Sequence, residues 1–246
     1  MSTYSEFKTK LISLSDDTYR EFSKKTIPSD RPFLGVRIPD IKKLVKAIPP
    51  EKIEEFINAT PVAIEEVLAR GFAIARLPYE KMLEKFDSHV ALLDNWCTVD
   101  TFVAALRKTV SHHEADFLDK KVEPLLKSSD EFAVRTGLVC LLDFFITPDY
   151  LPLIFDRIES TNRRIGSANS NIKSSTNNYY IKMALGWLLA ECFIKFPDIT
   201  YPYLKSSTLD SWTFNKAISK ICDSYRVDQA TKTHLKTLRK KEKNGR

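Results

Sequence analysis

Trp96 and Asp100 are the residues of this sequence whose types and spacing best suit chemistry. They stand four positions apart in a stretch of helical periodicity, so they lie one above the other on one helix face. A carboxylate stabilises positive charge that develops on a reacting group, and an indole face attracts electron-poor groups. A helical tryptophan is more often a core residue, and an aspartate near a helix start is more often a cap. Asp94 and Asn95 are available as caps, which leaves Asp100 inside the helix.

Trp187 is a third candidate, because it follows Gly186, whose missing side chain permits close approach of another backbone. If helical repeats curve around a groove, the two indoles and the carboxylate would converge there. Three segments are too particular for a generic helical protein: LGVRIPDIKKL at 34–44, DNWCTVDTF at 94–102 and YYIKMALGWLLAE at 179–191. In order and spacing they resemble the AlkD-like DNA alkylation repair family, over about residues 4 to 235.

The resemblance implies a DNA glycosylase that hydrolyses the N-glycosidic bond of N3- or N7-alkylated purines in duplex DNA. Asp100 would stabilise the positive charge that the departing base leaves on the deoxyribose, and Trp96 and Trp187 would form the walls of the site. The alkylated base is itself cationic and leaves readily, so no strong general acid is needed. No metal and no organic cofactor are implied.

Basic residues along the chain are candidates for contacts with the DNA backbone. Lys42 and Lys46 share a helix face by their spacing and follow Arg37, although a solvated face is an equally good interpretation. Lys182 is a similar case. The resemblance also places two adjacent arginines after the Trp96 helix, one of which serves the DNA site. Here Arg135 is followed by Thr136, and this departure puts phosphate anchoring and excision in doubt.

Helices are the elements that must position these residues. Glycines are few and never cluster, which excludes glycine-rich phosphate loops, and strand-like alternation is missing. Pairing of neighbouring helices gives about six hairpins of roughly 40 residues, the period of HEAT-type repeats. We therefore expect an all-α protein, an α-solenoid or superhelix with a concave DNA-binding groove; a compact bundle is the alternative. The helices are expected over 4–25, 39–48, 50–58, 61–76, 78–87, 90–110, 114–127, 130–146, 148–159, 178–195, 197–205, 211–223 and 228–241.

Residues 1–246 are expected to form a single domain with two polar additions. The segment 160–178 has the composition of a mobile loop, either a contact to nucleic acid or a solvated insertion. The residues 236–246 form a basic tail. Residues 232–246 hold seven of the 38 basic residues but one of the 32 acidic ones, which accounts for the whole net charge of +6. Such a tail suits phosphate contacts or a plain solvated end.

The cysteines, histidines and apolar runs limit the class of protein further. The four cysteines form no Cys-x-x-Cys pair and the histidines show no ligand spacing, so reduced buried thiols are expected and a metal site is not. No apolar run approaches the ~20 residues of a membrane span, and the N-terminus lacks a signal-peptide core. We expect a cytoplasmic protein with no membrane partner, and a monomer by default.

Two other functions remain open from the sequence. The first is a non-catalytic AlkD-like protein that binds damaged or branched DNA, which the Arg135–Thr136 departure favours. The second is a HEAT-repeat scaffold with a groove for a partner protein. Binding that weakens steeply with salt would favour DNA over a protein partner.

Overall fold

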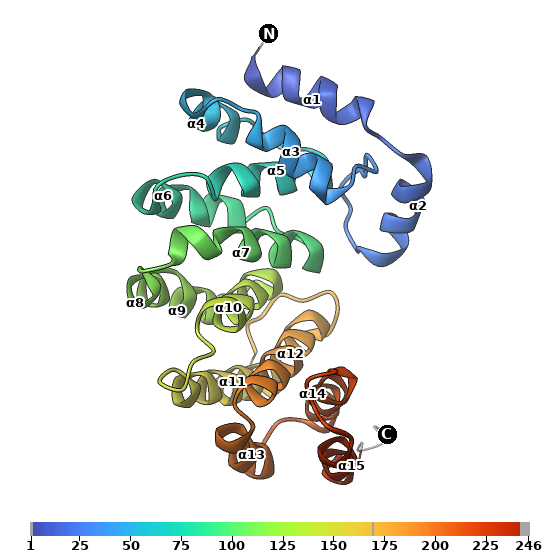
Figure 1. The fold of residues 1–246 in the computed structure, drawn as a ribbon, viewed down its shortest axis with the longest axis vertical. Helices are drawn as coiled ribbons and strands as arrows, with labels where there is room; N and C mark the ends of the chain where they lie inside the picture. The colour runs from blue at the N-terminus through green and yellow to red at the C-terminus, as the bar shows by residue number, and fades with distance from the viewer. Residues whose placement is uncertain (1, 169, 242–246) are drawn as a thin grey trace. The chain divides into compact units, whose positions relative to one another are not determined.

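The computed structural model describes residues 2–168 and 170–241, and every regular secondary-structure element of three or more residues within them is a helix (Figure 1). The only β-type pairing among these residues is an isolated bridge between Asp130 and Lys173. The expected all-α class is confirmed. The chain forms two compact units, Met1–His113 (unit 1) and Glu114–Arg246 (unit 2).

Unit 1 is built around α5, a helix whose residues are nearly all buried. Such a helix has neighbours on every side, and α5 packs against α3, α4, α6 and α7, while α1 contacts α3 and α4. The helices of this unit are α1 (Thr3–Ser13), α2 (Asp17–Thr26), α3 (Ile38–Lys46), α4 (Ile53–Ile57), α5 (Ile64–Ile74), α6 (Tyr79–Val90) and α7 (Trp96–Val110), with a 3₁₀ turn at Pro50–Lys52.

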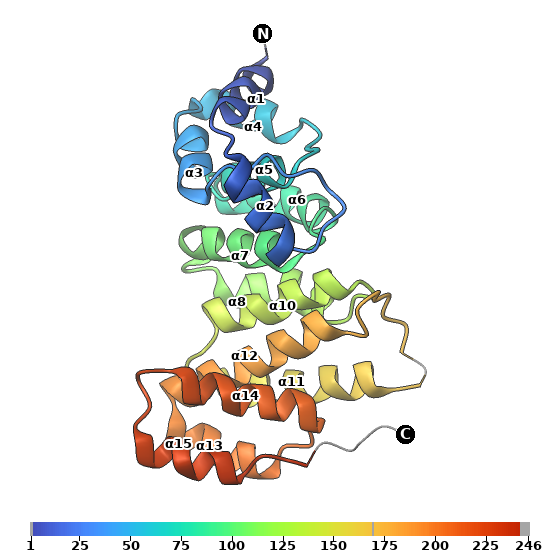
Figure 2. The same ribbon diagram turned by 90° about the vertical axis from the view of Figure 1, so that its right-hand side faces the viewer.

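Unit 2 is centred on α12, which packs against α10, α11, α13 and α14 (Figure 2). Its first three elements form one continuous helical stretch in which a π-helical turn, Leu118–Val122, separates α8 from α9. The helices of this unit are α8 (Glu114–Phe117), α9 (Glu123–Leu126), α10 (Glu131–Phe144), α11 (Leu151–Gly166), α12 (Tyr179–Lys195), α13 (Pro197–Ser206), α14 (Ser211–Asp223) and α15 (Gln229–Thr237).

Side-chain caps explain where several of these helices begin. Asp130, Asp210 and Asp228 each accept a hydrogen bond from the backbone N–H three residues later, at α10, α14 and α15. Asp16 caps α2 in the same way. The helix expected over 4–25 is therefore two helices, α1 and α2, and the prediction of one continuous helix is wrong.

The polar segment expected to be a loop over 160–178 is helical as far as Gly166, because α11 continues beyond the predicted end at 159. Arg164 in this last turn donates to the backbone oxygen of Ser128 at 2.9 Å. The basic tail expected over 236–246 is also partly packed: the Lys240 ammonium donates to the backbone oxygens of Ser207 and Leu209. Residues 242–246 of that tail lie outside the described residues.

None of the described helices has both the length and the apolar character that crossing a lipid bilayer requires.

Candidate functional site

Trp96 is the first residue of α7, and Asp100 lies one turn further along the same helix. Asn95 caps the helix by accepting from the backbone N–H of Thr98 at 3.0 Å. The face of α7 formed by Cys97, Val99 and other apolar residues is buried, whereas Trp96 and Asp100 are both partly exposed. The two residues therefore occupy an accessible side of the helix and not its core face.

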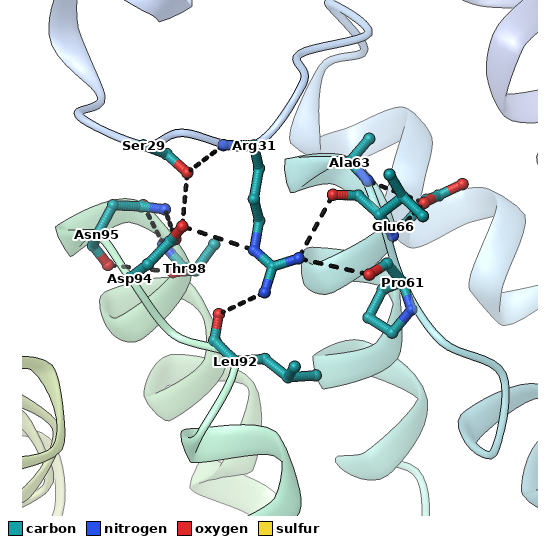
Figure 3. Close-up of polar contacts among 10 residues, drawn as sticks. Ser29, Arg31, Pro61, Ala63, Glu66, Leu92, Asp94, Asn95 and Thr98 are labelled. Atoms are coloured by element: carbon teal, nitrogen blue, oxygen red, sulfur yellow. Dashed lines mark hydrogen bonds and ion pairs between the residues drawn. The ribbon is translucent and has the colours of Figure 1, made fainter.

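A network centred on Arg31 holds the chain that leads into α7 (Figure 3). The Arg31 guanidinium lies 3.5 Å from Asp94 Oδ2 and donates to the backbone oxygen of Leu92. Ser29 Oγ donates to Asp94 Oδ2 at 2.7 Å, and the Asn95 amide donates to Asp94 Oδ1 at 2.7 Å. These contacts fix the turn that carries Trp96, because they tie it to the segment between α2 and α3.

The Trp96 indole N–H donates to the backbone oxygen of Thr26, the last residue of α2, at 3.0 Å. This bond commits the polar edge of the indole to the protein. The part of the ring that stays accessible is consequently an apolar π-surface, which suits contact with an electron-poor group.

The start of the segment 34–44 is held by a buried carboxylate, a structural role that the sequence did not predict. Glu65, which is buried in α5, accepts hydrogen bonds from the backbone N–H groups of Leu34, Gly35 and Val36 at 3.0, 2.8 and 3.3 Å. Gly35 adopts a φ of +83°, and a Cβ there would lie 2.3 Å from the backbone oxygen of Asp16. Glycine is therefore required at this position by both conformation and space.

The basic residues proposed near this segment differ in their surroundings. Arg37 donates to Asp16 Oδ2 at 2.9 Å, and its guanidinium carbon lies 4.8 Å from the centre of the Tyr19 ring. Lys42 and Lys46 are exposed on α3, one turn apart, and the Lys42 ammonium lies 5.1 Å from the centre of the Phe72 ring. The two lysines therefore lie on the same exposed face of the helix.

Arg135 and Thr136 lie in the interior of unit 2. Arg135 is 5% exposed and donates to the backbone oxygen of Tyr180 at 3.0 Å. Thr136 is fully buried, and its hydroxyl donates to the backbone oxygen of Phe132 at 2.7 Å. Arg135 thus connects α10 with the start of α12, the Thr136 bond lies within α10, and neither side chain forms part of an accessible surface.

Glu131 fastens the segment that leads into α12. Its carboxylate is 3% exposed and accepts from Ser174 Oγ at 2.6 Å, from Thr176 Oγ1 at 2.7 Å and from the Tyr180 backbone N–H at 3.0 Å. The polar segment before α12 is thus anchored at its end. We define these contacts as the Glu131 clasp.

Gly186 and Trp187 lie side by side in sequence but serve different surfaces. A Cβ at Gly186 would lie 3.3 Å from the backbone oxygen of Thr213, so glycine permits close packing of α12 on α14. The close approach expected at this glycine is confirmed, and its partner is the protein's own helix. Trp187 is partly exposed, with the Lys220 ammonium 5.8 Å from the centre of its ring. Lys182 is also partly exposed on α12.

Trp187 belongs to a larger aromatic and basic surface that sequence reasoning missed. The Trp212 ring lies 5.6 Å from the Tyr179 ring, and the Lys216 ammonium lies 5.3 Å from the Trp212 ring. The signal was present in the spacing, since Trp212, Lys216 and Lys220 recur every four residues of one predicted helix. All are partly or fully exposed. We call this surface the α12–α14 strip; it consists of Tyr179, Trp187, Trp212, Lys216 and Lys220.

Most cysteine thiols in the described part of the chain are buried, and potential metal ligands do not cluster there. Burial raises the pKa of the Cys97 and Cys140 thiols, and it raises that of Cys192 to about 12. Cys222 is partly exposed, and all four cysteines are free. No cluster of three or more potential ligand side chains of the His, Cys, Asp or Glu type occurs among residues 2–168 and 170–241.

The comparison with protein families decides the affiliation. The model of a family described as DNA alkylation repair enzyme matches residues 7–221, from within α1 to the last turn of α14. The chain belongs to this family. No individual curated protein matches the sequence. The matched range includes Trp96 and Asp100 of unit 1 and all members of the α12–α14 strip, whereas α15 lies beyond it.

Proposed function

We propose that this family member is a DNA glycosylase that hydrolyses the N-glycosidic bond of N3- or N7-alkylated purines in duplex DNA. The partly exposed pair of Trp96 and Asp100, one turn apart on α7, carries the proposal. Membership of a DNA alkylation repair family supports the class of substrate.

The proposed reaction depends on a charged carboxylate and not on a general acid that protonates the leaving base. When the bond between C1′ and the purine nitrogen breaks, its electron pair neutralises the cationic base, and positive charge develops on the deoxyribose. Asp100 would stabilise that charge and orient the water that adds to C1′ and then loses a proton to solvent. The products are a neutral alkylated base and an abasic site.

Trp96 would offer its accessible π-surface to the electron-poor sugar. Since the indole N–H is bonded to the Thr26 backbone oxygen, the ring is held in one orientation without help from the ligand. A wall that is fixed beforehand costs less to organise when the transition state forms.

The α12–α14 strip supports DNA binding by unit 2. Lysines beside aromatic rings suit nucleic acid, because ammonium groups neutralise phosphates while ring faces contact sugars or bases. We propose that Lys216 and Lys220 contact phosphates and that the exposed part of Trp187 contacts a sugar or base; its role as a second wall of the site stays a prediction. Lys182, Arg37, Lys42 and Lys46 are proposed as further backbone contacts. The continuous superhelix of about six hairpins, its concave groove and the single-domain organisation stay predictions.

The direct test is release of 7-methylguanine and 3-methyladenine from methylated duplex DNA. Wild type should release both bases, and Asp100→Asn should release them at least about 100-fold more slowly while still binding DNA, since one electrostatic group is worth ~3 kcal/mol at such a site. Asp119→Asn, a matched change at an exposed position of the π-helical turn, should behave as wild type. No release by wild type would refute the glycosylase proposal.

Binding of damaged or branched DNA without cleavage is the second candidate. The interior positions of Arg135 and Thr136 favour it, because the family resemblance implied a guanidinium at the DNA site. We therefore leave both residues out of the proposed DNA contacts. Salt-sensitive binding by wild type together with no base release would establish this alternative.

A further inference from the structure

A cavity of about 510 Å³ opens in unit 2 on elements that the proposed function does not use. Its wall includes Glu123 and Lys127 at α9, Arg157, Ser160 and Arg164 on α11, and Asn171 from the segment before α12. Small-molecule sites in proteins commonly have volumes of roughly 300–1,000 Å³. The cavity is thus large enough for a ligand and shares no residue with the α12–α14 strip.

The basic side chains of this cavity are unequally neutralised. Arg157 Nε donates to Glu123 Oε1 at 2.7 Å, and Arg157 also pairs with Asp156. Lys127 has only a 4.0 Å contact with Glu123 and is 79% exposed at its side chain. Arg164 has no acidic partner among the described residues; its Nη1 donates to the backbone oxygen of Ser128. The positive charge of Arg164 therefore faces the cavity unbalanced.

The second terminal nitrogen of Arg164 strengthens this asymmetry. Its Nη2 is buried and has no hydrogen-bond partner among the described residues. Burial lowers the pKa of Arg164, with no acidic group acting against it. A charged donor without an acceptor is unfavourable, and an anion bound beside the guanidinium would offset its charge.

We propose that this cavity is a binding site for a phosphomonoester, of about the size of a mononucleotide. The Arg164 guanidinium supplies a positive charge in the wall that no carboxylate of the described residues neutralises, Lys127 adds a second positive charge on an exposed side chain, and the Asn171 amide is a hydrogen-bond donor. The phosphate has two possible sources: a free nucleotide, or the 5′-phosphate at an end of DNA. Either one supplies the same chemistry.

Calorimetric titration of the full-length protein tests the site. Deoxyadenosine 5′-monophosphate should bind with one site per chain, and deoxyadenosine, which lacks the phosphate, should not bind. Arg164→Gln should weaken binding at least tenfold. Arg163→Gln, the same change at the neighbouring exposed residue outside the cavity wall, should leave affinity within twofold of wild type.

A second variant guards against a folding defect, since Arg164→Gln also removes the bond to Ser128. Lys127→Gln changes a largely exposed side chain and should weaken binding about threefold without altering the unfolding transition. Absence of saturable binding by wild type would overturn the proposal. Equal weakening in Arg164→Gln and Arg163→Gln would overturn it as well.

The two sources are separated with short duplexes that differ only in a 5′-phosphate or a 5′-hydroxyl. A gain in affinity from the 5′-phosphate that disappears in Arg164→Gln would assign the site to a DNA end. Binding of the mononucleotide with no such gain would assign it to a free nucleotide. Both results support a phosphate site, and both are independent of base release, so this test and that of the glycosylase proposal can fail separately.

Discussion

Replacing Glu131 by glutamine removes the charge from the centre of the Glu131 clasp while keeping nearly the same size. Three donors, the Ser174 and Thr176 hydroxyls and the Tyr180 backbone N–H, converge on this carboxylate at 2.6–3.0 Å. A glutamine offers one acceptor oxygen in place of two and turns an N–H₂ toward the remaining donors. The substitution therefore weakens every bond of the clasp and replaces at least one acceptor with a donor.

The expected loss of stability follows from the number and type of these bonds. Hydrogen bonds to a charged group contribute about 1.5–3 kcal/mol each, and neutral ones about 1 kcal/mol. The hydroxyls can rotate and accept from the new amide, so we expect a net cost of about 2–3 kcal/mol rather than the full sum. Because α12 begins at Tyr179, the disturbance should be concentrated at the start of this helix.

Urea unfolding and hydrogen exchange measured by mass spectrometry check this prediction. Glu131→Gln should lower the unfolding free energy of the transition that involves unit 2, and amides of 174–180 should exchange faster than in wild type. Ser175→Ala, at an exposed position of the same segment, should change neither quantity. The reasoning is refuted if Glu131→Gln unfolds within about 0.5 kcal/mol of wild type, the usual range of neutral surface changes.

Three further predictions concern Gly35, His89 and the lysines of the strip. Gly35→Ala should cost at least about 2 kcal/mol in urea unfolding, because the residue combines a φ of +83° with no room for a Cβ. Burial, reinforced by Arg70, lowers the His89 pKa from 6.5 to about 3. The unfolded chain consequently binds the proton first, and stability should fall by up to about 1.4 kcal/mol per pH unit as pH drops from 6.5 toward 3, a slope that His89→Gln should flatten. Lys216→Ala and Lys220→Ala should each reduce the slope of log affinity against log salt by about 0.9 for duplex DNA, whereas unchanged slopes would exclude phosphate contacts.

The sequence predicted helices well where capping residues and apolar periodicity agreed. The helix expected over 211–223 has these bounds in the structure, where Asp210 caps its start. The break between α1 and α2 was missed because the chain contains no glycine or proline there, and only Asp16 marks the new start. The extension of α11 to Gly166 was missed because its last turn is polar and is held by Arg164, a contact to Ser128 that lies far away in sequence.

The candidate site was predictable only in part, for a physical reason. Spacing indicated that Trp96 and Asp100 share a face, but it gave no sign that the indole N–H bonds to Thr26, 70 residues away. Arg135 is a residue type normally found at the surface, so its burial against the Tyr180 backbone oxygen depended on tertiary packing. The spacing of Trp212, Lys216 and Lys220 on one helix could be predicted from the sequence. That this helix packs against α12, which completes the α12–α14 strip, depends on tertiary structure.

The burial of the thiols has a consequence for a protein of this family. Reagents that alkylate DNA also attack sulfur, and the thiolate is the form that reacts. Cys97, Cys140 and Cys192 are buried with raised pKa values, so they stay protonated and out of reach of such electrophiles. Cys222 alone is partly exposed among the four. Alkylating conditions should therefore modify Cys222 before the other three thiols.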